Sequence, residues 1–202
     1  MAYMDTYHQW LADFAADKQT VRELTAIAGD TKEIEDRFYT GLSFGTGGMR
    51  GVLGMGTNRM NVYTVRRATQ GLANFLNAEA VKTGKRPSVV VAYDSRRMSP
   101  EFAAESVLTL CANGINAKIF DSLRPVPILS FAVRHLQTDA GIVITASHNP
   151  PQYNGYKVYG ADGAQIGPEV ADEVTRAINA LSYTAAKTMT REAATKEGLL
   201  QV

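Results

Sequence analysis

The sequence predicts an α/β fold: a three-layer α/β/α domain with a mostly parallel mixed sheet, preceded by a helical N-terminal extension. The first observation is that short β-branched apolar runs alternate with amphipathic stretches from residue 61 to residue 144. This order is typical of parallel sheets covered by helices. The second observation is that apolar residues up to about residue 40 recur at helical spacing.

Length and composition limit the classes of protein that are expected. The chain has 202 residues, 45% of them hydrophobic, and a net charge of +1. This length supports one globular core and hardly two. The balanced charge indicates neither a nucleic-acid nor a membrane partner, and no apolar run is long enough to span a bilayer. A single cysteine, Cys111, excludes an internal disulfide, and the first residues do not resemble a signal peptide, so we expect a cytoplasmic protein.

The first forty residues are expected to be helical. One apolar helix face is formed by Tyr7, Trp10, Leu11 and Phe14 at positions i, i+3, i+4 and i+7. Because Trp10 lies on this face, we expect it in the core rather than at a ligand. A break follows at Gly29, after which Asp30 or Thr31 caps the next helix.

Strands and helices then alternate. Asn61 caps a long helix that Gly84 ends, and Ser99 is expected to cap the helix that Pro100 and Glu101 open. The expected elements are helix 61–83, strand 88–93, helix 99–113, strand 116–120, helix 127–136, strand 141–144, helix 168–181, a short helix 191–197 and an incomplete strand 198–202. Because parallel strands end at one sheet edge, loops 94–97, 121–127 and 145–152 are expected to form an active-site wall there.

Two stretches carry candidate chemistry. Residues 141–151, GIVITASHNPP, read as a buried strand that ends in a stiff loop presenting Ser147 and His148. A second short strand with Lys157 follows. Upstream, residues 44–51, FGTGGMRG, combine flexible backbone amides with Arg50, a pairing suited to phosphate. Taken alone, both stretches also fit plain turns.

Together, residues 145–160, TASHNPPQYNGYKVYG, resemble the active-site serine loop of the α-D-phosphohexomutases, the phosphoglucomutase and phosphomannomutase family. That loop reads Thr-Ala-Ser-His-Asn-Pro followed by Asn-Gly-x-Lys. FGTGGMRG is similar to the family's Phe-Gly-Thr-x-Gly-x-Arg segment. The resemblance covers residues 38–182 and only the first of the family's four domains. The N-terminal helices and FGTGGMRG look most like the branch with the longer phosphoglucomutases and phosphopentomutases.

The resemblance implies a role for each matched residue. Ser147 would carry the phosphoryl group. Arg50, His148 and Lys157 would form a cationic cluster around it, with Lys157 as general acid/base. Thr46, Gly47, Gly48 and Arg50 would bind phosphate.

The resemblance also implies cofactors and partners. Mg²⁺ would bind through the phosphoryl group of Ser147, with its other ligands in an Asp-Gly-Asp-x-Asp-Arg loop that this sequence does not contain. Asp94, Asp121 and Asp162 are scattered singly and do not replace that loop. A glucose 1,6-bisphosphate-type activator, a phosphosugar substrate and later domains of the same chain are expected.

The resulting division is a helical extension over residues 1–40, phosphohexomutase domain I over 41–182, and a connector over 183–202 toward later domains. The expected function moves a phosphoryl group between the 1- and 6-positions of a hexose through a phosphoserine and a bisphosphate intermediate. The 202 residues alone are expected to be inactive.

Three alternatives remain. A phosphopentomutase and a non-catalytic phosphate- or partner-binding domain of the same fold share the motifs. A serine hydrolase is disfavoured, because no G-x-S-x-G elbow is present. In addition, neighbouring residues of an extended segment point in opposite directions, so His148 is not expected to reach Ser147.

Overall fold

The computed structural model describes residues 2–202, and the first residue of the expected extension lies outside this range. A six-stranded sheet with the order β1-β5-β4-β2-β3-β6 forms its centre. The strands are Met49–Val52 (β1), Ser88–Tyr93 (β2), Asn116–Ile119 (β3), Ala140–Ile144 (β4), Tyr153–Gly160 (β5) and Leu200–Gln201 (β6). β4, β2, β3 and β6 pair in parallel, whereas β5 pairs antiparallel with both β4 and β1. The expected mixed, mostly parallel sheet is confirmed.

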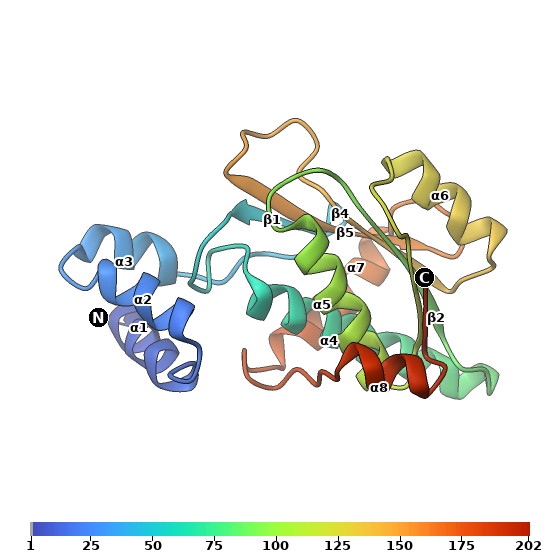
Figure 1. Cartoon of the computed structure of the whole chain (residues 1–202), viewed down its shortest axis with the longest axis horizontal. Helices are drawn as coiled ribbons and strands as arrows, with labels where there is room; N and C mark the ends of the chain where they lie inside the picture. The colour runs from blue at the N-terminus through green and yellow to red at the C-terminus, as the bar shows by residue number, and fades with distance from the viewer. Residues whose placement is uncertain (1) are drawn as a thin grey trace.

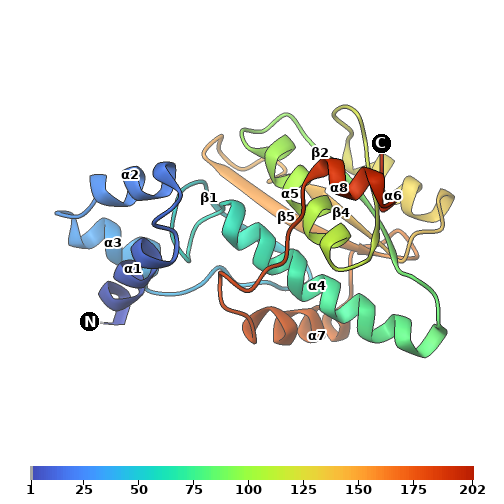
Figure 2. The same cartoon turned by 60° about the horizontal axis from the view of Figure 1, so that its bottom comes forward.

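Helices cover both faces of the sheet unequally (Figures 1 and 2). The helices are Ala2–Asp13 (α1), Lys18–Ala26 (α2), Thr31–Phe38 (α3), Val62–Thr83 (α4), Ser99–Ala112 (α5), Val126–His135 (α6), Pro168–Asn179 (α7) and Arg191–Lys196 (α8). Residues of α4, α5, α7 and α8 share the larger core on one face, while α6 packs on the other face. No helix within residues 2–202 has the length and apolar character needed to cross a membrane.

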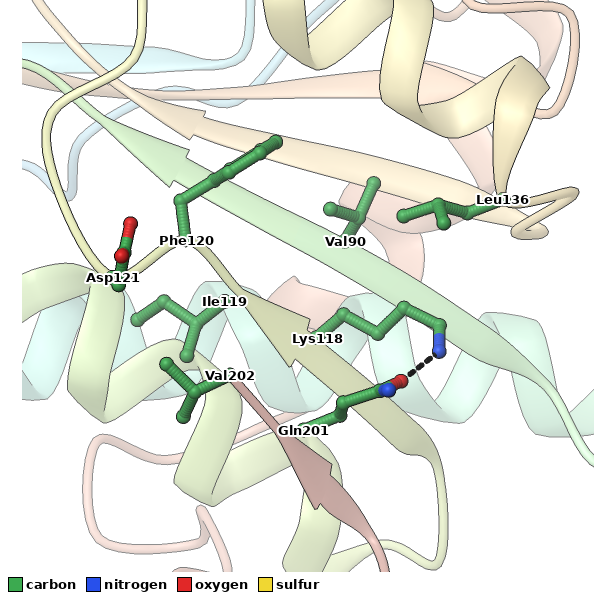
Figure 3. A pocket seen from close by; sticks show the side chains of 8 residues that line it. All are labelled: Val90, Lys118, Ile119, Phe120, Asp121, Leu136, Gln201 and Val202. Carbon is green, nitrogen blue, oxygen red and sulfur yellow. Dashed lines mark hydrogen bonds between the residues drawn. The ribbon is translucent and has the colours of Figure 1, made fainter.

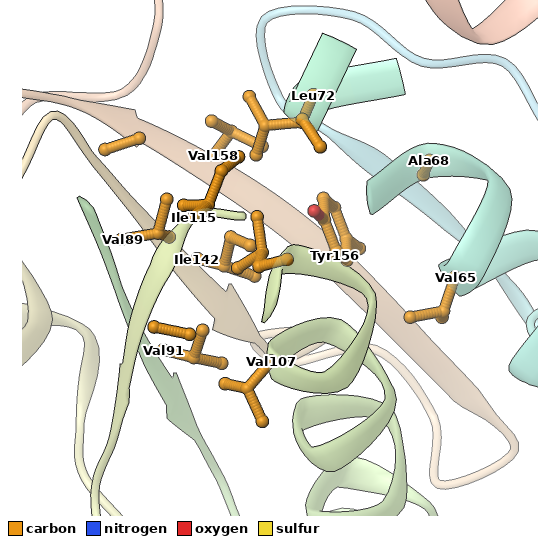
Figure 4. Packing of buried hydrophobic residues seen from close by; sticks show 14 of the residues in the cluster. Val65, Ala68, Leu72, Val89, Val91, Val107, Ile115, Ile142, Tyr156 and Val158 are labelled. Atoms are coloured by element: carbon orange, nitrogen blue, oxygen red, sulfur yellow. The ribbon is translucent and has the colours of Figure 1, made fainter. Parts of the chain in front are cut away.

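The larger core fixes the strands that carry the site. Figure 4 shows Ile142 of β4 and Tyr156 of β5 packed toward Leu72 of α4. Tyr156 is fully buried, and its hydroxyl meets that of Thr69 at 3.2 Å. Because side chains alternate along a strand, burying Tyr156 on this face places Lys157 on the other.

The N-terminal helices form a lobe with its own core, at the left of Figures 1 and 2. Trp10 is 1% exposed and meets Phe14, Phe38 and Tyr63 edge-on, so its expected core position is confirmed. An ion pair from Arg59 to Asp36 and a hydrogen bond of 3.1 Å from Arg37 Nη1 to the Met55 carbonyl oxygen fasten this lobe to the loop after β1.

Three predicted caps, which belong to two helices, are confirmed, and one predicted cap is wrong. Asp30, Asn61 and Gly84 take the positions expected of them. Ser99 is instead the first residue of α5, and Met98 precedes it with a φ of 65°. The Ser99 hydroxyl does not cap the helix, because it donates to Asp94 Oδ1 at 2.8 Å instead.

Two further features were not anticipated. Residues 14–17 separate α1 from α2, and Asp17 caps α2 by accepting from the backbone N–H of Gln19 at 3.0 Å. The second half of the glycine-rich stretch is a strand, β1, at the edge of the sheet. With four residues and one glycine, it gives too short a periodicity to indicate a strand.

Candidate functional site

Ser147 lies in an exposed turn just beyond the carboxyl end of β4. Thr145 and Ala146 are still buried, and the Ser147 N–H donates to Thr145 Oγ1 at 3.0 Å. Ser147 has a φ of 55°, in the left-handed region that residues with a Cβ rarely occupy. Such a conformation persists where its surroundings enforce it, and it is frequent at functional sites. The turn brings the Ser147 hydroxyl out of the sheet into solvent.

His148 contacts Ser147 directly. The Ser147 Oγ lies 3.2 Å from His148 Nδ1, so the expectation that these neighbours point apart is wrong. The reason is the left-handed Ser147, which replaces the extended geometry on which that expectation rested. Within residues 2–202, no carboxylate hydrogen-bonds His148, so the pair lacks the third member of a hydrolase triad.

Arg50 reaches the serine loop from β1. Its Nη1 donates to Asn149 Oδ1 at 2.6 Å, across 99 positions of sequence. β5 brings the two segments together, because Arg50 pairs with Gly155. A Cβ on Gly155 would lie 2.6 Å from the carbonyl oxygen of Thr145, so glycine is needed for this close approach.

Lys157 provides a second cation near Arg50. It lies on β5 opposite Val143 and is half-buried. Burial lowers the pKa of Lys157, and the positive charge of Arg50 lowers it further. Among the described residues, neither cation forms an ion pair with a carboxylate. Two neighbouring, unneutralised cations favour an anionic ligand.

The glycine-rich loop lies against the same strand. Gly45 and Gly48 exchange two backbone hydrogen bonds of 3.1 and 2.7 Å. Gly48 has a φ of 77°, and a Cβ there would lie 1.9 Å from the carbonyl oxygen of Tyr156 and 2.8 Å from Lys157 Cα. Thr46 and Gly47 are exposed at the tip. Within residues 2–202 the Thr46 hydroxyl makes no hydrogen bond, so backbone groups and not this side chain close the loop.

Other loops gather at this sheet edge as predicted. Arg96 of loop 94–97 donates to backbone carbonyl oxygens of the serine loop, and the Arg124 N–H donates to the Tyr93 carbonyl oxygen at 3.0 Å. The three single aspartates stay apart, because Asp94 contacts Arg96 and Ser99 while Asp121 pairs with Arg124. Over residues 2–202 no group of three His, Cys, Asp or Glu side chains is placed to hold a metal ion. These residues therefore do not form a Mg²⁺ site by themselves.

Two residues of this region make contacts that the sequence did not predict. Asn149 holds Arg50, and Arg96 lies beneath the serine loop. The only hint for Arg96 was its place in a polar loop after a buried strand, Asp94-Ser95-Arg96-Arg97. Nothing in that pattern indicates which of the two arginines turns inward.

An apolar cavity of about 370 Å³ lies elsewhere on the sheet (Figure 3). Val90, Lys118 and Phe120 line it together with the ends of α6 and β6. None of the predicted site residues lines this cavity, and its only drawn polar contact joins Lys118 to Gln201. The candidate chemistry therefore remains at the serine loop.

Comparisons with known sequences agree with the motifs. Residues 41–185 match the phosphoglucomutase/phosphomannomutase alpha/beta/alpha domain I. A phosphoglucomutase from Staphylococcus haemolyticus is 49% identical over 147 residues, covering 73% of this chain and 26% of that protein. One from Staphylococcus epidermidis is 43% identical over 153 residues, covering 76% and 27%. The chain thus spans about a quarter of the length of these relatives.

Solved structures share the same arrangement of helices and strands. A putative phosphomannomutase from Thermus thermophilus superimposes with a TM-score of 0.60 at 34% identity, covering 72% of this chain and 31% of the other. A phosphoglucomutase/phosphomannomutase family protein from Burkholderia thailandensis gives 0.57 at 26% identity, covering 73% and 31%. In both cases the likeness extends over less than a third of the solved chain.

Proposed function

Since this chain belongs to the phosphoglucomutase/phosphomannomutase family, whose domain I it matches over residues 41–185, we propose that it is the N-terminal part of a phosphosugar mutase. The reaction moves a phosphoryl group between the 1- and 6-positions of a hexose through phospho-Ser147 and a bisphosphate intermediate. We also propose the division into residues 1–40, 41–182 and 183–202, with later domains of the same chain completing a cytoplasmic enzyme.

The observation that supports this most is the surroundings of Ser147. An exposed hydroxyl with His148 at 3.2 Å sits at a strand end beside two cations that no carboxylate neutralises within residues 2–202. Phosphoryl transfer needs in-line positioning and positive charge around the equatorial oxygens, and little else from the protein. A hydrolase would need an oriented base, and His148 has no carboxylate partner here.

The proposed step uses residues of this chain in stated roles. The bond between phosphorus and Ser147 Oγ breaks as a sugar hydroxyl oxygen bonds to phosphorus. Lys157 in its neutral form accepts the proton of that hydroxyl, and its lowered pKa makes this form accessible. The leaving Ser147 Oγ takes a proton from His148 Nδ1. In the reverse transfer His148 Nδ1 accepts that proton back as Ser147 Oγ bonds to phosphorus, and Lys157 returns its proton to the departing sugar oxygen. Arg50, Gly47 and Gly48 bind phosphate oxygens, and Thr46 contributes its hydroxyl.

Two cofactors complete the proposal, both resting on the family resemblance. Mg²⁺ would neutralise charge on the transferred group, with one ligand from phospho-Ser147 and the others from the later domains of the longer chain. Residues 2–202 contain no group of three His, Cys, Asp or Glu side chains placed to hold a metal ion. A glucose 1,6-bisphosphate-type activator would load Ser147.

We expect mutase activity from the longer chain and none from the 202 residues alone. The experiment supplies the longer chain with glucose, mannose or ribose 1-phosphate, each with its bisphosphate and Mg²⁺, and measures product formation. Turnover of a hexose phosphate supports the proposal, and preference for ribose 1-phosphate would assign a phosphopentomutase instead. No turnover with any of the three, despite phosphate binding, would favour the non-catalytic domain.

Phosphate binding to the 202-residue chain is expected to weaken as pH rises through the pKa of Lys157. Lys157 is a cation only below that pKa, which burial and Arg50 place below the usual 10.5. The loss of affinity should therefore begin at a lower pH than for an ordinary lysine. Titrations with inorganic phosphate between pH 7 and 10, followed by NMR, measure it.

Arg50→Gln sharpens this test, because it should lower the affinity for phosphate at pH 7 and at the same time raise the pKa of Lys157. Losing one charged hydrogen-bond donor should weaken phosphate binding at pH 7 by about tenfold. Removing the neighbouring charge should also raise the pKa of Lys157, so that the remaining affinity persists to higher pH. Arg22→Gln, at an exposed position of α2, is the matched control and should change neither quantity. An unshifted pH profile in Arg50→Gln would contradict the pairing.

A further inference from the structure

Arg96 fixes the backbone of the serine loop from beneath. Its Nη2 donates to the carbonyl oxygens of Ser147 at 2.8 Å and Asn149 at 2.7 Å. Its Nη1 donates to those of Pro150 and Tyr153, both at 3.1 Å. One guanidinium thus binds four backbone carbonyl oxygens between Ser147 and the first residue of β5, and each of its two terminal nitrogens donates to two of them.

A second set of residues orients Arg96. Asp94 Oδ2 lies 3.6 Å from Arg96 Nε, and Asp94 Oδ1 accepts from the Arg96 backbone N–H at 2.9 Å. Ser99 donates to the same oxygen of Asp94, and the fully buried Asn154 donates to Ser99 Oγ at 3.0 Å. The Arg96 side chain is only 14% exposed. This network joins the carboxyl end of β2, the first turn of α5 and the start of β5.

The planar, two-pronged guanidinium of Arg96 suits the geometry of the serine loop. Ser147 holds a φ of 55°, and a residue with a Cβ loses about 1–2 kcal/mol in that region unless other contacts offset it. A planar guanidinium can serve carbonyls on both sides of the turn at once, which a lysine ammonium cannot. We propose that Arg96 is a positioning residue, oriented by Asp94, that holds Ser147 in its reactive conformation through these four carbonyl contacts. The inference rests on the proposed role of Ser147 and assigns Arg96 no contact with substrate.

The test uses a thiol reporter and needs no mutase activity, so its failure is distinguishable from a failure of the proposed function. In Ser147→Cys, the new thiol should react rapidly with iodoacetamide at neutral pH, because His148, Arg50 and Lys157 favour its thiolate. The native Cys111 should stay silent, since it is 2% exposed and burial raises its pKa to about 11. Alkylation is followed by mass spectrometry across a range of pH values.

In the Ser147→Cys background, Arg96→Gln should lower the alkylation rate of residue 147 at pH 7 by about tenfold, the effect of a thiol pKa one unit higher. Arg96→Lys should lower the alkylation rate to a similar extent, because a lysine ammonium keeps the positive charge but cannot bind the four carbonyl oxygens that fix the turn. Arg97→Gln is the matched control: Arg97 is exposed, and its carbonyl oxygen, which the substitution keeps, accepts from Asn154. It should leave the rate unchanged.

The outcomes separate three roles for Arg96. Loss of reactivity in both Arg96 variants, at temperatures where thermal unfolding shows a folded chain, supports positioning. Full reactivity in Arg96→Lys alone would mean that only the charge matters, and full reactivity in both, with a lower Tm, would mean a merely structural role. Either result overturns the proposal. If neither variant folds, Asp94→Asn decides: it keeps the four donors but weakens their orientation, so the rate should fall about two- to threefold, and an unchanged rate refutes the inference.

Discussion

Ser147→Ala is expected to abolish turnover in the longer mutase chain. Without the hydroxyl there is no atom to carry the phosphoryl group, and loss of a covalent nucleophile typically costs roughly 10⁴-fold or more in kcat. The fold should be unaffected, because Ser147 is exposed and its Oγ contacts only His148 among the described residues. The measurement is a coupled mutase assay together with thermal unfolding of the same preparation.

Ser147→Gly is the informative companion variant. It also removes the hydroxyl, but glycine occupies the left-handed region without strain, so the chain should be at least as stable as the original. Equal inactivity of both variants would assign the effect to the missing oxygen and not to a displaced turn. Activity within about tenfold of the original in either variant would show that another group carries the phosphoryl.

Among glycine-to-alanine substitutions near the site, Gly48→Ala is expected to lower the stability of the chain most. The left-handed φ of 77° costs alanine about 1–2 kcal/mol, and the clash with the Tyr156 carbonyl oxygen at 1.9 Å adds about 1–3 kcal/mol. Because the clashing atoms belong to the backbone, either β5 or the glycine-rich loop must shift. The glycine-rich loop would then lie farther from Lys157. We expect a free energy of unfolding lower by about 2–5 kcal/mol and at least tenfold weaker phosphate binding.

Gly47→Ala provides the control one position away. A Cβ at Gly47 meets no atom within 4 Å, and its φ is not in the left-handed region. Its free energy of unfolding should stay within about 0.5 kcal/mol of the original. Urea unfolding of both variants, compared with the original chain, measures the difference. If Gly48→Ala proved as stable as Gly47→Ala, the packing of this loop on β5 would be wrong.

Most of the fold followed from patterns that act locally. Strand β4 and helix α4 are long, strongly patterned and bounded by capping or turn residues, so periodicity located them. The edge strand β1 was not predicted, because only its pairing with β5 defines these four residues as a strand. The cap of α5 was misassigned because Ser99 had a tertiary partner, Asp94, that no local pattern reveals.

The site shows the same division. TASHNP led to the prediction that Ser147 is the reactive residue, but the contact with His148 depends on one dihedral angle, which residue order does not encode. Arg96 could not be chosen over Arg97, because its partners are backbone carbonyls about 50 positions away and carry no side-chain signature. The serine loop is thus recognisable from sequence, whereas its support is visible only in three dimensions.

The pairing of β1 with β5 also bears on when the site can form during synthesis. Arg50 and Gly155 face one another only after the intervening β2, β3 and β4 have been made. Closing so long a loop is slow compared with forming local helices. A nascent chain therefore holds Arg50 and the glycine-rich loop without a strand to pair with until residues 153–160 have left the ribosome. A translation product that stops between Ser147 and Lys157 carries the serine and lacks the part of β5 on which Lys157 lies.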